Sequence, residues 1–386
     1  MGAESLLFSF FLIFTGATVL STVALFLRVP LLVAYIVVGI LLGPFGLNFI
    51  SDASLLVDIA EIGILFLLFL LGLDMQPAKL MHTLRNTFLV TLISSLLFMF
   101  LGLATGLLFA FSFQDSLVIG FTMIFSSTII GIKLLPTTVL HQRHMGELIV
   151  GILLLQDFIA IFLLVFLDQG TLEGAETLRT LVAFPALLLL AWGATRFVLV
   201  PLIARYDQFK EYLFLLAIGW CLGMAETAEL IGLTPEVGAF TAGVSLATSP
   251  IAMYLSDRLK PLRDFFLILF FFSLGAQFNL TLIDRFIWPA VILSGLALSV
   301  KPIVFRALLL RLSERRALAW EAGLRLGQIS EFSLLIAFVA LQAGSISETA
   351  AMTIQGAAIL TFLFSSYIVV MLCPTPIAVD PRLRRD

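Results

Sequence analysis

The stretch GILLLQDFIAIFLLVFL, residues Gly151–Leu167, places a glutamine and an aspartate side by side in an otherwise apolar run. With the residues before it, this run is long enough for a helix that crosses a bilayer, which takes about 20 apolar residues. An aspartate at the centre of such a helix costs about 2.5–3.5 kcal/mol to insert. Asp157, with Gln156 beside it, is therefore a candidate functional residue inside a membrane.

The composition of the whole chain agrees with this interpretation. Of its 386 residues, 61% are hydrophobic and only 12% are charged, whereas soluble domains carry about 25% charged residues. The chain is therefore predicted to be an all-α polytopic membrane protein. Cys221 and Cys373 lie in apolar runs, no basic block suggests nucleic acid, and three histidines do not suggest a metal enzyme. We expect neither enzymatic activity nor a cofactor.

Apolar runs recur along the chain and predict about 13 transmembrane spans. The expected spans are 5–26, 31–50, 55–74, 86–111, 115–137, 145–167, 178–200, 211–229, 234–252, 262–279, 286–310, 317–342 and 350–372. No basic region precedes the first run, so the sequence predicts a true span there rather than a cleaved signal.

The basic residues predict how the spans are oriented, because lysine and arginine favour cytoplasmic loops. Most of the 22 basic residues fall in alternate connections and in the C-terminal tail, while the opposite connections hold Arg179 and Arg285. We expect the N-terminus outside and the C-terminus in the cytoplasm, in a bacterial inner membrane.

The two halves of the chain show a weak internal repeat. FLLGLD at Phe69–Asp74 recurs as FSLGAQ at Phe272–Gln277, an offset of 203 residues. The same offset pairs Gly120 with Gly323, Ser127 with Ser330, Thr128 with Glu331 and Glu61 with Asp264, and Gly39 falls on Gly243 after a slip of one residue. The offset covers an odd number of spans, so the copies have opposite orientations. Two inverted six-helix repeats joined by a linker helix are a transporter architecture.

Two small polar clusters interrupt equivalent spans of the two repeats. They are FSSTII at Phe125–Ile130 and GQISEFS at Gly327–Ser333. Where a helix breaks inside a membrane, its freed backbone groups need partners, which hydroxyl side chains can supply. We therefore expect crossed, broken helices here, with Glu331 and Ser330 compensating the partly positive helix ends. The hydroxyls of Ser127 and Thr128 are expected to face the cation as part of the ion- and proton-binding set. The alternative is that they bond back to their own helix.

Lys301 is the most deeply placed lysine, in the middle of its span beside Pro302. It is a candidate counter-charge for Asp157 that a cation or proton could displace. The alternative for both residues is a static ion pair that holds helices together. Asp58 and Glu61 lie near the expected outer end of the third span, where they line an external funnel or belong to a solvated helix end.

Taken together, these residues resemble the monovalent cation:proton antiporter superfamily, and within it the Kef-type potassium efflux systems. The matching segments are GILLGPFGL (Gly39–Leu47), AEIGILFLLFLLGLDM (Ala60–Met75), FSSTIIG (Phe125–Gly131), LLQDFIAI (Leu154–Ile161) and GQISEFSLL (Gly327–Leu335). The resemblance covers essentially the whole chain, residues 1–386.

The resemblance implies a homodimer with the sodium/proton-antiporter fold and an elevator mechanism. Residues 1–80 and 205–280 would form the dimerisation scaffold, 178–204 the linker helix, 84–167 and 284–372 the mobile ion-transport core, and 373–386 a cytoplasmic tail. Asp157 would be the carboxylate shared by ion and proton, with Gln156 beside it. Thr128, Ser127 and Glu331 would lie at the helix crossing, and Lys301 would pair with the carboxylate.

The Gln-Asp pair indicates which ion is exchanged. A single carboxylate can hold one proton or one monovalent cation, and Gln156 adds an oxygen ligand without adding a charge. We therefore predict electroneutral exchange of K+ for H+, with Na+ as the alternative cation at Asp157 and Gln156. A cation channel and a sodium-coupled organic-anion symporter are more distant alternatives.

One feature departs from the Kef-type pattern. Such proteins usually continue into a cytoplasmic nucleotide-binding regulatory domain, and this chain has no G-x-G-x-x-G turn after a strand. The sequence is therefore expected to be either a constitutive or separately regulated member or a membrane-domain fragment.

Overall fold

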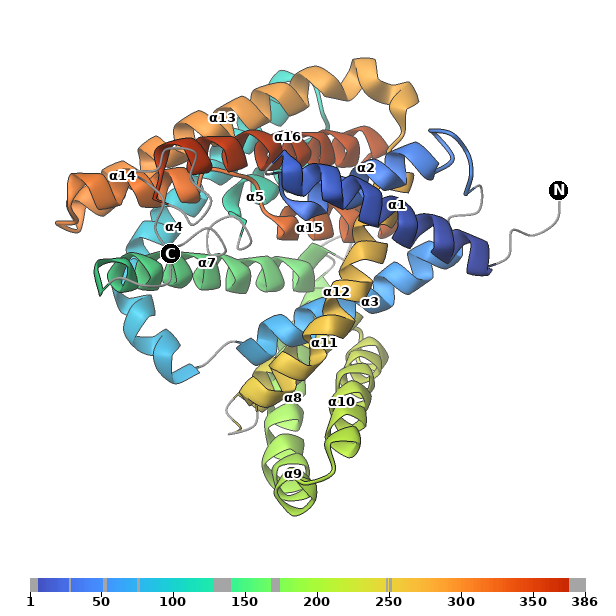
Figure 1. Cartoon of the computed structure of the whole chain (residues 1–386). Coiled ribbons are helices and arrows are strands. Elements are labelled where there is room, and N and C mark those ends of the chain that lie inside the picture. The colour runs from blue at the N-terminus through green and yellow to red at the C-terminus, as the bar shows by residue number, and fades with distance from the viewer. Residues whose placement is uncertain are drawn as a thin grey trace.

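The computed structural model describes residues 6–27, 29–50, 54–74, 77–127, 140–167, 174–247, 249 and 252–374, with the backbone alone at some helix positions. In this part of the chain all regular structure is helical (Figure 1). The elements are α1 (Leu6–Phe26), α2 (Leu31–Leu42), α3 (Ser54–Asp74), α4 (Pro77–Leu108), α5 (Phe113–Ile124), α7 (Leu140–Leu167), α8 (Gly174–Ala194), η1 (Thr195–Leu199), α9 (Val200–Tyr206), α10 (Lys210–Leu230), α11 (Pro235–Ala247), α12 (Ala252–Ala276), η2 (Leu280–Leu282), α13 (Ile283–Arg311), α14 (Arg316–Arg325), α15 (Glu331–Gln342) and α16 (Glu348–Leu372).

The prediction of an all-helical architecture is confirmed for the described residues. Each expected span contains a helix, and within the described residues six helices are long and apolar enough to cross a bilayer unaided. Others are short. The 12 residues of α2 extend over only about 18 Å at 1.5 Å per residue, less than the hydrocarbon core of about 30 Å.

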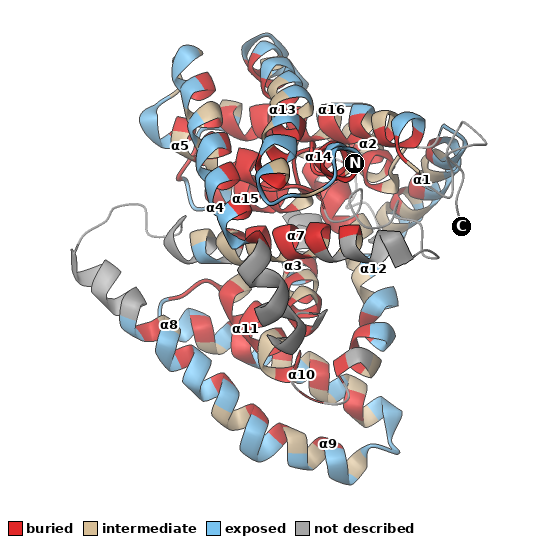
Figure 2. Ribbon diagram, turned by 90° about the vertical axis from the view of Figure 1, so that its left-hand side faces the viewer, coloured by how far each residue is buried: buried red, intermediate tan, exposed pale blue. Residues whose placement is uncertain are grey.

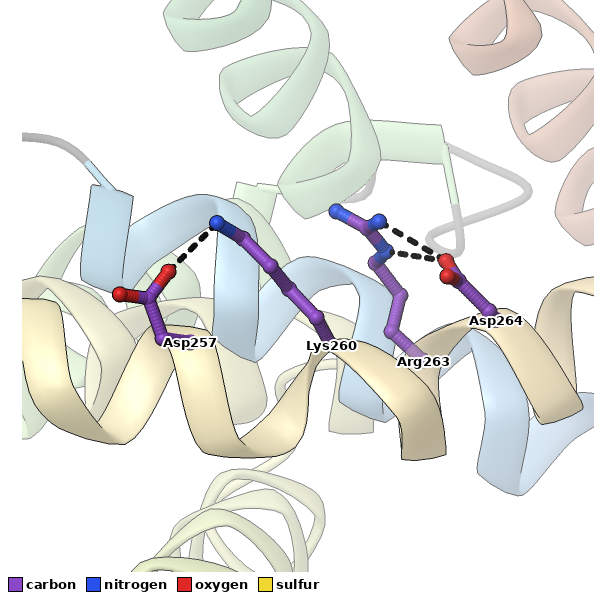
Figure 3. A network of polar contacts seen from close by, with 4 residues as sticks. All are labelled: Asp257, Lys260, Arg263 and Asp264. Carbon is purple, nitrogen blue, oxygen red and sulfur yellow. Dashed lines mark hydrogen bonds and ion pairs between the residues drawn. The ribbon is translucent and has the colours of Figure 1, made fainter.

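The tenth expected span begins earlier than the sequence indicated. We placed its start at 262, but α12 starts at Ala252 and passes through Pro261. The charged residues that suggested a loop pair with each other along the helix (Figure 3): Lys260 Nζ lies 2.6 Å from Asp257 Oδ1, and Arg263 Nη2 lies 2.8 Å from Asp264 Oδ1. A polar segment of mixed charge is thus compatible with a continuous helix.

The twelfth expected span is broken, as the polar cluster predicted. Helix α14 ends at Arg325 and α15 starts at Glu331. In the fifth span, α5 ends at Ile124 and Phe125 is extended, with φ −78° and ψ 144°. Residues 128–139, including Thr128, lie outside the described residues.

The helices pack in two groups (Figure 1). In one group, α4, α5, α7, α13, α14, α15 and α16 contact one another, and in the other α1, α2, α3 and α8–α12 do so. A single hydrophobic cluster nevertheless includes residues of both groups. Phe158 of α7 packs against Phe240 of α11, and Phe270 of α12 against Phe338 of α15. Burial is greatest around α14–α16, whereas α8, η1 and α9 expose one face (Figure 2).

Two helix crossings in the second group depend on glycine. A Cβ at Gly39 of α2 would clash with the Phe272 carbonyl oxygen, and one at Gly243 of α11 would clash with the Phe69 carbonyl oxygen. Gly39 faces Gly275, and Gly243 faces Gly72. The 203-residue offset, with its slip of one residue, relates the α2–α12 crossing to the α3–α11 crossing.

Asp115 joins the starts of α5 and α16. It is 7% exposed, and its carboxylate accepts hydrogen bonds from the backbone N–H of Ser347 at 2.7 Å and from the Ser347 hydroxyl at 3.1 Å. Replacing Asp115 by alanine should lower the free energy of unfolding by about 1–3 kcal/mol, since two donors lose their acceptor. The apparent Tm of the purified protein in detergent measures this loss.

Asp257→Ala is the matched control, because the Asp257 carboxylate bonds only to Lys260 among the described contacts and is 62% exposed. That replacement should change stability by no more than about 0.5 kcal/mol. Equal losses of Tm in the two variants would contradict a specific role for Asp115.

Candidate functional site

Asp157 lies in α7 and is 3% exposed. No hydrogen bond or ion pair from a described residue reaches its carboxylate. Buried charges are ordinarily paired or hydrogen-bonded, because desolvation without compensation is expensive. We therefore expect this carboxylate to hold a proton or a cation.

Gln156 holds the end of α5. Its Nε2 donates to the Ile124 carbonyl oxygen at 3.0 Å, and its Oε1 accepts from the Ser126 N–H at 3.0 Å. These backbone groups lie where the helix stops and lack helical partners. We expected Gln156 chiefly as an ion ligand, but its amide first supports the helix break. An amide oxygen has two lone pairs, so one remains for a cation.

The chain segments at the two helix breaks lie side by side. The Ser126 hydroxyl donates to the Leu326 carbonyl oxygen at 2.8 Å. The Gln328 Nε2 donates to the carbonyl oxygens of Ser127 and Arg325, at 3.3 and 2.8 Å. Ser127 is fully buried. In these contacts the two polar clusters are joined by side chains that donate to backbone carbonyls of the other segment, and not by hydrogen bonds between two side chains.

Lys301 is 0% exposed and joins the two breaks. Its Nζ donates to the Phe125 carbonyl oxygen at 2.8 Å and to the Gln328 carbonyl oxygen at 2.9 Å. The expected ion pair with Asp157 is not found among the described contacts. The physical reason is that each helix leaves carbonyls with partial negative charge at its C-terminal end. The ammonium donates to one carbonyl just after α5 and to one just after α14. In the described contacts Lys301 therefore donates to carbonyls beyond the C-terminal ends of both broken helices, and its role in compensating charge at the crossing stays a prediction.

The start of α15 carries the predicted acid. Ser330 is the N-cap and its hydroxyl accepts from the Phe332 N–H at 3.1 Å. Glu331 is in the first turn, where a negative charge complements the partly positive helix end. The Ser333 hydroxyl, one turn further, donates to the Thr122 carbonyl oxygen of α5 at 2.7 Å.

Three predicted residues are not brought to this site by the described contacts. Thr128 lies outside the described residues, and so does the side chain of Asp58, whose backbone belongs to α3. Glu61 is exposed on α3. The external funnel that Asp58 and Glu61 were expected to line stays a prediction.

The structure adds residues that sequence reasoning missed. Gln328 and Ser126 were inside the polar clusters, but neither was selected as a site residue. From α16, the Thr361 hydroxyl accepts from the Ile329 N–H at 3.2 Å and the Ser365 hydroxyl donates to Gln328 Oε1 at 3.1 Å. Thr361 and Ser365 are four residues apart and so share one helix face, a pattern that can be read from the sequence.

The donor set has a clear chemical character. No group of three histidine, cysteine, aspartate or glutamate side chains suited to a metal ion is found in the described part of the chain. The polar oxygens at the two helix breaks are instead those of backbone carbonyls, serine hydroxyls and side-chain amides, and Asp157 is the residue next to Gln156. These are hard oxygen ligands, which suit protons and alkali cations better than transition metals.

Comparison with known proteins places the chain among ion exchangers. Residues 10–373 match the family described as sodium/hydrogen exchanger, transmembrane. The chain is 29% identical to K(+) efflux antiporter 5 of Arabidopsis thaliana over 80% of its own length and 56% of that protein. It is 30% identical to the glutathione-regulated potassium-efflux system protein KefC of Salmonella arizonae, covering 87% of this chain and 56% of KefC.

Two further matches add to this. The iron transporter MagA of Paramagnetospirillum magneticum is 30% identical over 81% of this chain and 73% of MagA. Among solved structures, the sodium proton antiporter MjNhaP1 of Methanocaldococcus jannaschii matches with a TM-score of 0.69 and 14% identity, covering 95% of this chain and 96% of that one. The chain spans about half the length of the K(+) efflux relatives, since 56% of each is covered.

Proposed function

The chain belongs to the sodium/hydrogen exchanger transmembrane family, and on this premise we propose that it exchanges K+ for H+ across a membrane at Asp157. Membership confirms the resemblance to the monovalent cation:proton antiporters and makes the chain a multi-pass integral membrane protein of a transporter family. The exchanged cation, the stoichiometry and the mechanism are parts of the proposal.

The observation that carries the proposal is the buried carboxylate of Asp157, to which no described residue donates a hydrogen bond, next to Gln156, whose amide binds the end of α5. One carboxylate carries one negative charge, so it is neutralised by one proton or by one monovalent cation. Binding of either excludes the other. Competition at one such group gives electroneutral exchange with no further machinery.

Oxygen-bearing residues next to Asp157 in the sequence and just after α5 support cation binding. Ser127 and Thr128 belong to the segment after α5, and Gln156 retains one lone pair on its amide oxygen. Together with Asp157 they form the proposed ion- and proton-binding set, with Glu331, Lys301 and Ser330 compensating charge at the helix ends. Neutral oxygens with a single carboxylate give a modest field, which favours a large, partly dehydrated ion such as K+.

The two packing groups support an elevator movement. The proposed mobile core is the group of α4, α5, α7 and α13–α16, which contains the site, and the other group would be the scaffold and dimerisation domain, with α8–α9 as linker. The paired glycine crossings support the inverted repeats, because equivalent glycines of both repeats take part. Carrying an empty, charged carboxylate past apolar residues such as Phe240 is costly, so only the neutralised core would move.

The remaining parts of the proposal follow the Kef-type relatives. We expect a homodimer in a bacterial inner membrane, with the N-terminus outside and the C-terminus in the cytoplasm. Any nucleotide-binding regulatory domain would act on the membrane domain from a separate chain or segment. An Na+/H+ exchanger on the same site is the alternative function, favoured by the sodium proton antiporter among the structural matches.

Cation-driven dequenching of a pH-sensitive dye in proteoliposomes tests the function. We expect K+ to alkalinise a vesicle lumen that was acidified beforehand, at a rate unchanged by a potassium-independent clamp of the membrane potential. A larger response to Na+ would assign the site to sodium exchange. A response that depends on the clamp would contradict the electroneutral mechanism.

A further inference from the structure

Arg325 is a buried charge that the proposed exchange does not use. It is the last residue of α14, immediately before the break, and is among the largest side chains that are fully buried, with 0% exposure. A buried guanidinium is expensive unless it is paired and hydrogen-bonded. Its partners therefore indicate what it is there to hold.

The guanidinium joins the ends of two helices. Its Nε and Nη2 lie 3.1 and 2.8 Å from Glu321 Oε1, one turn earlier in α14. Its Nη2 also donates to the Pro374 carbonyl oxygen at 2.6 Å. Pro374 follows Cys373, the residue that caps the C-terminal end of α16. Arg325 thus links the C-terminal end of α14 to the residue that follows the C-terminal end of α16.

The backbone of the same residue leads into the site. The Arg325 carbonyl oxygen accepts from Gln328 Nε2, which also donates to the Ser127 carbonyl oxygen. The Gln328 carbonyl oxygen accepts from Lys301, and its Oε1 accepts from Ser365 of α16. A path of contacts therefore leads from Pro374 through the side chain and backbone of Arg325 to Gln328 and Ser127, with a part-buried hydrogen bond at Pro374 and buried hydrogen bonds at Gln328.

We propose that Arg325 is a positioning residue for the ion site, through which the position of the chain at Pro374 sets the affinity for the transported cation. The inference rests on the proposed function and extends it, because it names the point at which a force on the C-terminal chain would reach the site. If Pro374 moves, Arg325 moves with it, and the carbonyls held by Gln328 shift relative to Asp157.

The geometry calls for arginine. One guanidinium can direct separate N–H groups to Glu321 and to Pro374 in a fixed plane, whereas a lysine ammonium is a compact charge on a flexible stem. Lysine should therefore keep the charge balance with Glu321 while holding Pro374 less firmly.

The experiment compares Arg325→Ala and Arg325→Lys with the control Arg306→Ala. Arg306 is an exposed arginine of α13 whose guanidinium lies 5.2 Å from the centre of the Trp320 ring. With exchange measured in proteoliposomes, Arg325→Ala should raise the apparent KM for K+ about tenfold, the loss expected for one charged hydrogen bond. Its maximal rate should change less. Arg325→Lys should give a smaller rise in KM, and Arg306→Ala should match the wild type.

Hydrogen exchange supplies a readout that does not depend on transport. The peptide covering residues 326–333 should exchange faster in the Arg325 variants than in Arg306→Ala, while α4 peptides stay unchanged. Wild-type KM in a folded Arg325 variant, or a lowered Tm with no change in KM or in local exchange, would overturn the inference. If Arg325→Ala does not fold, Arg325→Lys carries the same comparison.

The failure of the function and the failure of the inference can be distinguished. If the wild-type protein transports neither cation, the proposed function fails. The coupling is refuted separately if the amide hydrogens of residues 326–333 exchange at the same rate in the Arg325 variants as in Arg306→Ala. If the wild type exchanges K+ and the Arg325 variants match Arg306→Ala, only the coupling fails.

Discussion

Replacing Asp157 by asparagine should reduce K+-driven proton movement in proteoliposomes to the level of protein-free vesicles. Asparagine keeps the size of the side chain and one oxygen ligand, but it carries no charge for a proton or cation to neutralise. The carboxylate is 3% exposed, and the described part of the chain shows no hydrogen bond to it whose loss would destabilise the fold. The variant should therefore keep its oligomeric state and its Tm.

Asp264→Asn is the matched control. Its carboxylate pairs with Arg263 and is 62% exposed on α12 (Figure 3), and exposed pairs contribute at most about 1 kcal/mol. Exchange by this variant should stay within about twofold of the wild type, since twofold corresponds to about 0.4 kcal/mol. Normal exchange by Asp157→Asn would remove Asp157 from the mechanism, and a large loss in Asp264→Asn would point to an acid on the scaffold instead.

Much of the fold could be predicted from the sequence, because hydropathy and helix length are local properties. The spans around Asp157 and Lys301 were placed correctly in this way. The break between Arg325 and Glu331 was also predictable, since a glycine, a glutamine and a serine interrupt an apolar run there. The start of α12 was not, because pairing between Asp257 and Lys260 makes a charged stretch compatible with a helix, and composition alone does not reveal pairing.

The sequence predicted which residues belong to the candidate site better than it predicted which groups they contact. The expense of a buried charge singles out Asp157, Lys301 and Glu331 without any structure. Their partners depend on segments far apart in the chain, such as Phe125 and Gln328 for the ammonium of Lys301. From sequence alone, a buried cation is expected to pair with a buried anion. A broken helix also provides carbonyl acceptors for the cation, and only the three-dimensional packing decides which of the two it contacts.

Replacing Lys301 by methionine tests this difference. Methionine fills a similar volume but donates no hydrogen bond, so the Phe125 and Gln328 carbonyls lose their donor inside the protein. Each unsatisfied buried group costs about 1–3 kcal/mol, and we expect a net loss of stability of about 2–4 kcal/mol after allowing for relief of the buried charge. The variant should show a lower apparent Tm and little exchange, whereas Lys260→Met, at an exposed ion pair, should change neither.

A double-mutant cycle then distinguishes the carbonyl bridge, in which Lys301 donates to the Phe125 and Gln328 carbonyls, from an ion pair between Lys301 and Asp157. If Lys301 stabilises the protein by donating to the two carbonyls, adding Asp157→Asn to Lys301→Met should not restore the lost Tm. The two changes in the free energy of unfolding should then be additive within about 0.5 kcal/mol. If the lysine instead balances the carboxylate, removing both charges should recover stability, because the single variant leaves an uncompensated buried charge. Recovery in the double variant would therefore refute the carbonyl bridge and restore the ion pair that the sequence alone suggested.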